Sequence, residues 1–374
     1  LSSAASDVYK RQPLFHTEYE QEKKMTSNEI LPSQNAIMIF LTSFFLKLSS
    51  LPALLAKELD TSAFIVIVFF CLFELILSAV VYFLQLDGAK DAIDKSKLKF
   101  PLYALMCLYF CTKLFFALGF IVNFVTNFLF ESIPLYVVIL TFMLPVVYLG
   151  YKGIKTIGRT AQFFFIITII CLFLLLAFLK INLDMGRLMP IFSKPPKTVF
   201  ESMFGYGLWL GDALPLILCK IKRPKKFLMP LSCAASYGLI VVVSMISAAA
   251  FGSALYINHN LFVNLSVFNQ LSSVLGRLQY LSIIPWMVAS IISSSILFWS
   301  ASTCAQTFVK NEIAAKAAVA LIIVIAFLAI GHSDVLIDNS VGYLGYVMTG
   351  AIVVIALSVL IINAVRRRKD AKTV

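Results

Sequence analysis

An acidic residue and several glycines interrupt one of the apolar segments of this chain. Residues 204–215 read FGYGLWLGDALP, and Asp212 falls inside a segment long enough to cross a bilayer. An interrupted helix exposes backbone N–H and C=O groups that lipid cannot satisfy, and a carboxylate at that depth costs about 2.5 kcal/mol or more. Asp212 could take an ammonium group, while Trp209 or Tyr206 could wall a side-chain pocket. We therefore predict a small-molecule binding site here; the alternative is a kinked helix with a partnered acid.

Backbone donors at such an interruption favour an anionic partner. The N-termini of half-helices direct partial positive charge and free N–H groups toward anions, and an amino-acid carboxylate is the natural guest. The predicted donors are the backbone and hydroxyl groups of Ser49, Ser50, Gly205, Tyr206 and Gly207. The alternative is that the glycines only permit close helix packing.

Four charged residues fall within apolar segments: Lys47, Glu74, Lys113 and Asp212. Buried charges are expected to pair, because an unpaired one neutralises instead. Lys47 and Asp212 lie beside two predicted interruptions, so we predict that they pair, directly or through water. The pair is either a structural link or a site that senses a proton or substrate. We predict structural roles for Lys113 and Glu74, which either pair with each other or leave Lys113 to extend toward the membrane surface.

The elements that hold these residues are membrane helices. Of the 374 residues, 60% are hydrophobic and 13% charged, and the mean hydropathy is +0.91, whereas soluble domains are about 25% charged. The composition predicts an all-α polytopic membrane protein with about ten transmembrane helices. The net charge of +12 needs no nucleic acid. If both termini are cytoplasmic, 19 Lys and Arg residues lie inside and 6 outside. The connection 180–197 is the one segment that fits this orientation poorly, because it lies outside and carries four of the six outside basic residues.

The ten predicted spans form two groups of five. They are Asn35–Leu55, Ala63–Leu84, Pro101–Asn127, Ile133–Tyr151, Ala161–Ile181, Phe200–Cys219, Leu228–Tyr256, Leu271–Phe308, Ala314–Gly331 and Val341–Ala364. The first is interrupted at Phe45–Pro52 and the sixth at Phe204–Pro215. Paired interruptions predict a 5+5 inverted repeat, residues 35–181 and 200–364, within one transmembrane domain, residues 25–374. Residues 1–24 are expected to be a non-native or disordered leader, with Met25 the natural start.

Three stretches resemble the spore-germination permease family, the B subunits of endospore germinant receptors. They are GIKTIGRTAQFFFIITII, NLDMGRLMPIF and FGYGLWLGDALPLILCKIKRPKK. The matching residues are Gly153, Ile157, Arg159, Leu188, Pro190, Gly205, Gly207, Asp212, Pro224, Lys225 and Lys226. The resemblance covers most of residues 35–364. It implies the LeuT-like fold of the amino acid–polyamine–organocation superfamily, with helices 1 and 6 broken.

The resemblance also implies a function. It predicts a receptor subunit in the spore inner membrane or cell membrane that senses a small nutrient, expected to be an amino acid, with an A-type subunit and a lipoprotein C-type subunit as partners. The first interruption lacks the family's glycines and carries Lys47, so we predict binding and signalling with little net transport. The alternative is a proton- or sodium-coupled amino-acid transporter of the same superfamily. The sequence shows neither a nucleophile–base pair nor metal-ligand spacing, and we predict no enzyme, cofactor or metal.

Overall fold

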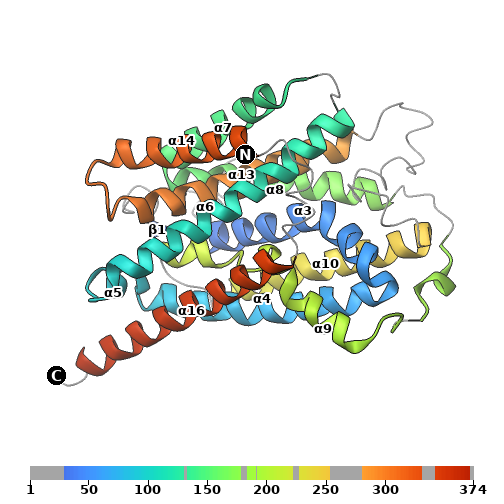
Figure 1. Ribbon diagram of the computed structural model, residues 1–374, viewed down its shortest axis with the longest axis horizontal. Helices are drawn as coiled ribbons and strands as arrows, with labels where there is room; N and C mark the ends of the chain where they lie inside the picture. The colour runs from blue at the N-terminus through green and yellow to red at the C-terminus, as the bar shows by residue number, and fades with distance from the viewer. Residues whose placement is uncertain are drawn as a thin grey trace, which may run out of the picture.

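The computed structural model describes residues 29–129, 133–177, 183–190, 192–221, 227–252, 280–330 and 342–370. Helices dominate this part of the chain, and most run side by side along the long axis of the molecule (Figure 1). The longer helices are α3 (Pro32–Leu59), α4 (Ala63–Leu86), α6 (Lys99–Phe124), α7 (Leu135–Lys152), α8 (Ile154–Ala177), α10 (Leu228–Phe251), α13 (Tyr280–Ala305), α14 (Glu312–Ile330) and α16 (Tyr343–Asp370). The shorter elements are β1 (Glu29–Ile30), η1 (Asp60–Ser62), α5 (Ala89–Asp94), η2 (Val125–Leu129), η3 (Met185–Leu188), α9 (Pro196–Gly205), η4 (Gly207–Trp209), η5 (Leu214–Leu218) and β2 (Lys220–Ile221).

Eight helical segments of the described residues are long and apolar enough to cross a membrane. Their outward side chains are apolar as well: Ile76, Ile166 and Ile325 are each more than 60% exposed, which suits a lipid environment. The prediction of an all-helical polytopic membrane protein is confirmed. The count is lower than the ten predicted because the sixth predicted span is divided into short pieces. In addition, α3 from Ser50 onward and α4 form one continuous apolar segment, Ser50–Leu86.

The first predicted span is not interrupted. Residues 45–52 belong to the single helix α3, which runs 28 residues from Pro32 to Leu59 with Pro52 inside it. The prediction of a broken helix 1 was therefore wrong. A proline removes one helical N–H and can be accommodated as a kink. The segment around it has no glycine and is rich in leucine, which favours helix.

The sixth predicted span is interrupted as expected. Helix α9 ends at Gly205, one 3₁₀ turn follows in η4, and a second 3₁₀ helix, η5, begins at Leu214. Gly211 between them has φ +83°, and a Cβ on it would lie 2.1 Å from the Tyr109 hydroxyl. Only glycine fits that backbone conformation at so close an approach. This interrupted segment, residues 206–213, is the element that carries the candidate site.

Helices α3, α4, α6, α10 and α13 form the interior against which this segment lies. Helix α3 packs mainly on α10, and α13 packs on α6, α8, α3 and α7. The serine-rich face of α13 is buried in these contacts: Ser290, Ser293 and Ser300 are all inaccessible to solvent. Small polar residues at helical spacing mark a packing face between helices, which accounts for the burial of these serines.

Short contacts join elements at the two ends of the bundle. At one end, β1 pairs in parallel with β2, so that Glu29 lies opposite Lys220 and Ile30 opposite Ile221. The start of α3 is thereby joined to the residues that follow η5. At the other end, η3 and the connection after it lie over α3 and α4, where the Ser193 hydroxyl donates to the carbonyl of Leu59 at 3.0 Å.

Candidate functional site

Asp212 is held by two lysines from two different helices. Lys47 of α3 lies 2.6 Å from Asp212 Oδ2, and Lys113 of α6 lies 2.8 Å from Asp212 Oδ1. All three residues are buried, with exposures of 1%, 7% and 5% for Lys47, Lys113 and Asp212. The predicted Lys47–Asp212 pair is present in the structure as a direct contact. Each carboxylate oxygen therefore receives a charge-assisted hydrogen bond, the strong class in a low-dielectric interior.

Glu74 of α4 binds the backbone of the interrupted segment. Its Oε1 accepts hydrogen bonds from the N–H groups of Gly211 and Asp212, the latter at 3.2 Å. Lys47 Nζ lies 3.9 Å from the same oxygen. Glu74 is fully buried, and its Oε2 has no hydrogen-bond partner within the described ranges. The side chain thus satisfies two of the N–H groups that the interruption exposes and retains one free acceptor.

The prediction for Lys113 and Glu74 was wrong in its partners. Lys113 contacts Asp212 and donates to the carbonyl of Leu210, so it neither extends to the membrane surface nor has Glu74 as its hydrogen-bond partner. Lys113 can reach the unwound backbone because α6 lies directly against it. Together these charged residues form a buried group that we call the Asp212 cluster: Lys47, Glu74, Lys113 and Asp212. With two basic and two acidic residues, its formal charge is zero.

Two tyrosines complete the Asp212 cluster. Lys47 donates to the Tyr237 hydroxyl of α10, and the ammonium lies 4.6 Å from the centre of that ring. The Tyr109 hydroxyl of α6 donates to the carbonyl of Leu210 at 3.0 Å. Tyr237 does not stand out in the sequence, because it lies in an apolar span without a charged residue. Tyr109 lies one helical turn before Lys113, which was the one signal available for it. They anchor the interrupted segment to α6 and Lys47 to α10.

The predicted ligand pocket at this level is nearly closed. A cavity of about 30 Å³ lies among Lys47, Lys113, Trp209 and Asp212, enough for about one water molecule and far below the volume of a bound metabolite. The Trp209 and Phe120 rings close one side, with centres 4.7 Å apart. In the described conformation the cavity beside the Asp212 cluster is therefore too small for an amino acid.

The remaining predicted site residues lie at different distances from the cluster. The Tyr206 hydroxyl donates to the carbonyl of Leu54 on α3 at 3.2 Å, so it links the interrupted segment to α3. Ser50 is half-buried on α3. Ser49 also belongs to α3, but its side chain lies outside the described residues. Their predicted ligand contacts stay predictions.

Gly205 and Gly207 face α16. A Cβ on Gly207 would lie 1.9 Å from Thr349 Oγ1 and 2.2 Å from the carbonyl of Gly345. The carbonyl of Gly205 accepts a hydrogen bond from Gly342 at 3.0 Å. Close packing of the interrupted segment on α16, the alternative weighed for these glycines, accounts for Gly207.

We expect Gly207→Ala to lower the melting temperature of the purified protein, because the new methyl group must displace α16. Overpacking of this kind costs about 1–3 kcal/mol. Gly350→Ala is the matched control. Gly350 lies on α16 itself, and a Cβ there meets nothing within 4 Å. Thermal unfolding of the two variants measures the difference. Equal melting temperatures would contradict the packing role.

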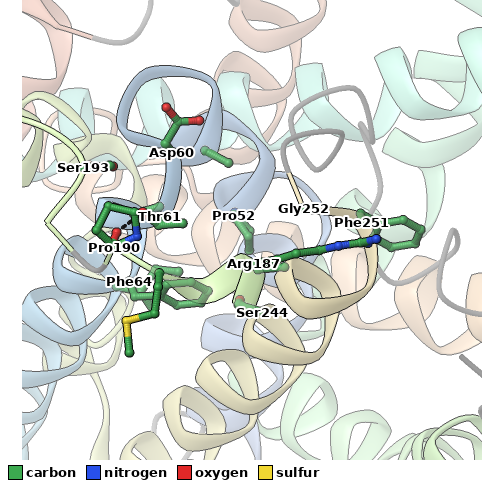
Figure 2. A pocket seen from close by; sticks show the side chains of 15 residues that line it. Pro52, Asp60, Thr61, Phe64, Arg187, Pro190, Ser193, Ser244, Phe251 and Gly252 are labelled. Carbon is green, nitrogen blue, oxygen red and sulfur yellow. Dashed lines mark hydrogen bonds between the residues drawn. The ribbon is translucent and has the colours of Figure 1, made fainter. Parts of the chain in front are cut away.

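A much larger cavity lies at the end of the bundle that carries η3. It has a volume of about 550 Å³, and we call it the η3 cavity. Figure 2 shows Thr61 and Pro190, joined by a hydrogen bond, at one side and Arg187 extending toward Phe251 and Gly252 at the other. This cavity was not predicted from the sequence. The one available signal was the basic character of residues 180–197 on the side predicted to be outside.

An interrupted membrane helix, held at its break by buried charges from neighbouring helices, defines a transporter-like membrane protein. Residues 29–335 match the spore germination protein family, and the chain belongs to that family. This is a transporter-like family without enzymatic activity, and its members are germinant-receptor B subunits, which associate with other receptor subunits.

Solved structures support the fold. The chain is similar to a single-residue variant of the manganese transporter of Eremococcus coleocola, with a TM-score of 0.56 and 12% identity over 89% of this chain and 78% of that one. At that identity the likeness shows the LeuT-like fold alone. A comparison with curated protein sequences finds no match. Within the described ranges, no group of three or more His, Cys, Asp or Glu side chains lies together as metal ligands would.

Proposed function

We propose that this chain is the nutrient-sensing B-type subunit of a germinant receptor and that it signals without net transport. Its ligand is a small nutrient, an amino acid, which binds at the interrupted segment and competes for Asp212. Its partners are an A-type membrane subunit and a lipoprotein C-type subunit. Family membership supports the receptor role, and the chemistry of the Asp212 cluster supports the ligand class.

The observation that carries the proposal is the Lys47–Asp212 contact of 2.6 Å. A lysine ammonium is chemically the same group as the ammonium of an amino acid. Lys47 therefore occupies Asp212 in the way a nutrient would, and it acts as an internal substitute for the ligand. Lys113 holds the other oxygen of Asp212 at 2.8 Å, so the carboxylate keeps one partner when the other is exchanged.

Glu74 offers the displaced lysine a second partner. Lys47 Nζ is already 3.9 Å from Glu74 Oε1, and Oε2 has no hydrogen-bond partner in the described part of the chain. Because a buried ammonium must remain paired, ligand binding would move Lys47 from Asp212 to Glu74. Glu74 also holds the backbone of the interrupted segment. The exchange would therefore alter the contact between α3, α4 and that segment, which is the proposed signal.

The continuous helix α3 supports sensing over transport. Alternating access in this fold relies on discontinuous helices that rearrange around a fixed site. Here only the sixth span is divided among the described residues, while the first runs unbroken through Pro52. We expect liposomes containing the protein to accumulate no more labelled amino acid under a H⁺ or Na⁺ gradient than empty liposomes. Gradient-driven uptake would favour the alternative, a coupled amino-acid transporter.

We expect Lys47→Met to separate binding from signalling. The variant keeps an unbranched side chain one atom shorter but removes the competing ammonium, so the ligand should bind about tenfold more tightly or better. Germination in response to the nutrient should nevertheless be lost, because no lysine can move to Glu74. Ligand-induced thermal stabilisation measures the first effect and spore germination the second.

Lys316→Met is the matched control, because Lys316 is also a buried lysine, 7% exposed, but pairs with Glu312 at 2.6 Å away from the Asp212 cluster. It should leave ligand affinity unchanged. A Lys47→Met protein that binds and responds as the wild type does would reject the competition for Asp212.

A further inference from the structure

The η3 cavity is bounded by five elements that meet at one end of the bundle. These are the last turns of α3, the short helix η1, the start of α4, the η3 turn with the connection after it, and the last turns of α10. Its volume of about 550 Å³ falls within the range of small-molecule sites, whereas the cavity at the Asp212 cluster has about 30 Å³. The η3 cavity is thus large enough to hold a metabolite.

A buried hydroxyl in its wall lacks a partner. Ser244 of α10 lines the cavity and is 1% exposed, and its Oγ has no hydrogen-bond partner among the described residues. On the same helix, the Ser236 and Ser247 hydroxyls donate to backbone carbonyls of their own helix. The buried hydroxyls of Ser290 and Ser293 on α13 also have no partner among the described residues, but they do not line this cavity, whereas Ser244 does. A buried hydroxyl left unpaired is costly and requires an explanation. A ligand atom in the cavity would supply the missing partner.

Arg187 brings a cation with spare donors to the same cavity. Its Nη1 donates to the carbonyl of Ala250, and its Nε lies 3.5 Å from Asp184 Oδ2. These contacts fix the guanidinium across the end of α10, as Figure 2 shows. A guanidinium has five N–H donors in a fork that matches a carboxylate. Two of the five have the partners named here, so the fork can bind a carboxylate while it stays anchored.

The other walls suit the rest of an amino acid. Figure 2 shows Asp60 at the cavity apart from Arg187, and the Asp60 carboxylate lies 3.7 Å from Lys194 Nζ. Apolar side chains, among them Phe64, Ile67 and Phe251, also line the cavity. A cation, a carboxylate and apolar side chains around one space complement a zwitterion with an apolar side chain.

We propose that the η3 cavity is a second binding site, which takes an apolar amino acid and binds its carboxylate through Arg187 and Ser244. The ligand class rests on the proposed function, and the site deepens it: the cavity would capture the nutrient on the side predicted to face outward, before it reaches Asp212. The basic residue Arg187 on the predicted outer side then has a role other than topology.

The test uses the full chain in lipid nanodiscs and three related probes. Leucine carries both charged groups, isocaproate lacks the ammonium, and isoamylamine lacks the carboxylate. We expect leucine and isocaproate to bind and isoamylamine to bind at least about tenfold more weakly. Arg187→Gln should weaken leucine and isocaproate binding at least about tenfold. Ser244→Ala should weaken both several-fold without lowering the melting temperature, because its hydroxyl has no partner to lose.

One control variant separates ligand binding from a general loss of charge. Lys197→Gln removes an exposed charge from the same end of the protein. It should bind leucine as the wild type does. Failure of leucine to bind, equal binding of isoamylamine, or wild-type binding by Arg187→Gln would overturn the proposal.

The two sites can fail separately. If Arg187→Gln loses leucine binding while Lys47→Met behaves as the wild type, the η3 cavity is retained and competition at Asp212 is rejected. If Lys47→Met changes affinity as predicted while Arg187→Gln has no effect, the η3 cavity alone is rejected.

Discussion

Replacing Asp212 with alanine is expected to cause the largest loss of stability of any substitution in the Asp212 cluster. The change leaves two buried ammonium groups without the carboxylate that both contact, at 2.6 Å and 2.8 Å. Breaking a buried pair costs about 3–5 kcal/mol, because the remaining charge is uncompensated. Lys47 would retain Glu74 at 3.9 Å, whereas Lys113 would retain only the carbonyl of Leu210 among the contacts described above. Thermal unfolding in detergent, followed by tryptophan fluorescence, measures the loss.

The second lysine decides which double variant recovers. Lys113→Met with Asp212→Ala leaves Lys47 beside Glu74, so its loss should be clearly smaller than the sum of the two single losses. Lys47→Met with Asp212→Ala leaves Lys113 and Glu74, which have no hydrogen bond to each other in the described structure, and should recover less. A simple double-mutant comparison reports this difference. Additive losses in both double variants would contradict the shared carboxylate.

Glu74→Leu is expected to have the second-largest effect. The substitution leaves the N–H groups of Gly211 and Asp212 without their acceptor, and each buried unpaired donor costs about 1–3 kcal/mol. It also leaves the two lysines with one carboxylate. The interrupted segment should therefore loosen, which amide hydrogen exchange over residues 206–213 would detect, together with a lower melting temperature.

Glu74→Gln is the informative comparison, because an amide keeps a carbonyl oxygen for the two N–H groups but cannot neutralise a displaced lysine. We expect it to be more stable than Glu74→Leu and yet to abolish the nutrient response. Glu201→Gln, at an exposed position, should change neither property. A Glu74→Gln protein with a normal response would show that Glu74 only supports the backbone.

The sequence was sufficient for the fold class and for one end of the site. Apolar runs predicted most helices within a few residues, since a membrane span leaves a long, unambiguous signal. The interruption after Gly205 and the Lys47–Asp212 contact were also predictable. Lipid tolerates neither unpaired backbone groups nor unpaired charges, so glycines and charged residues within an apolar span indicate a break and a charge pair. The break predicted in the first span was not real. Proline and serine in a leucine-rich segment weaken a helix without dividing it, whereas the glycines around Gly207 and Gly211 allow backbone conformations and approaches that no other residue does.

The partners of the other charges could not be read from the sequence. Lys113 lies on span three and Glu74 on span two. The partners of each depend on which face of its helix meets the unwound backbone. That choice is made by packing among α4, α6 and the interrupted segment, which a single sequence does not reveal. The 550 Å³ cavity at η3 was missed for the same reason, because its walls come from five separate elements.

The parallel pairing of β1 with β2 has a mechanical consequence. It joins Glu29 and Ile30, at the start of α3, to Lys220 and Ile221, directly after η5. Because backbone hydrogen bonds hold these ends together, α3 and η5 cannot slide past each other at this point. Relative motion between them reduces to a tilt about this fastening, and the displacement grows with distance from it. A tilt caused by a change at the Asp212 cluster would then displace most the end of α3 farthest from β1, where its last turns border the η3 cavity.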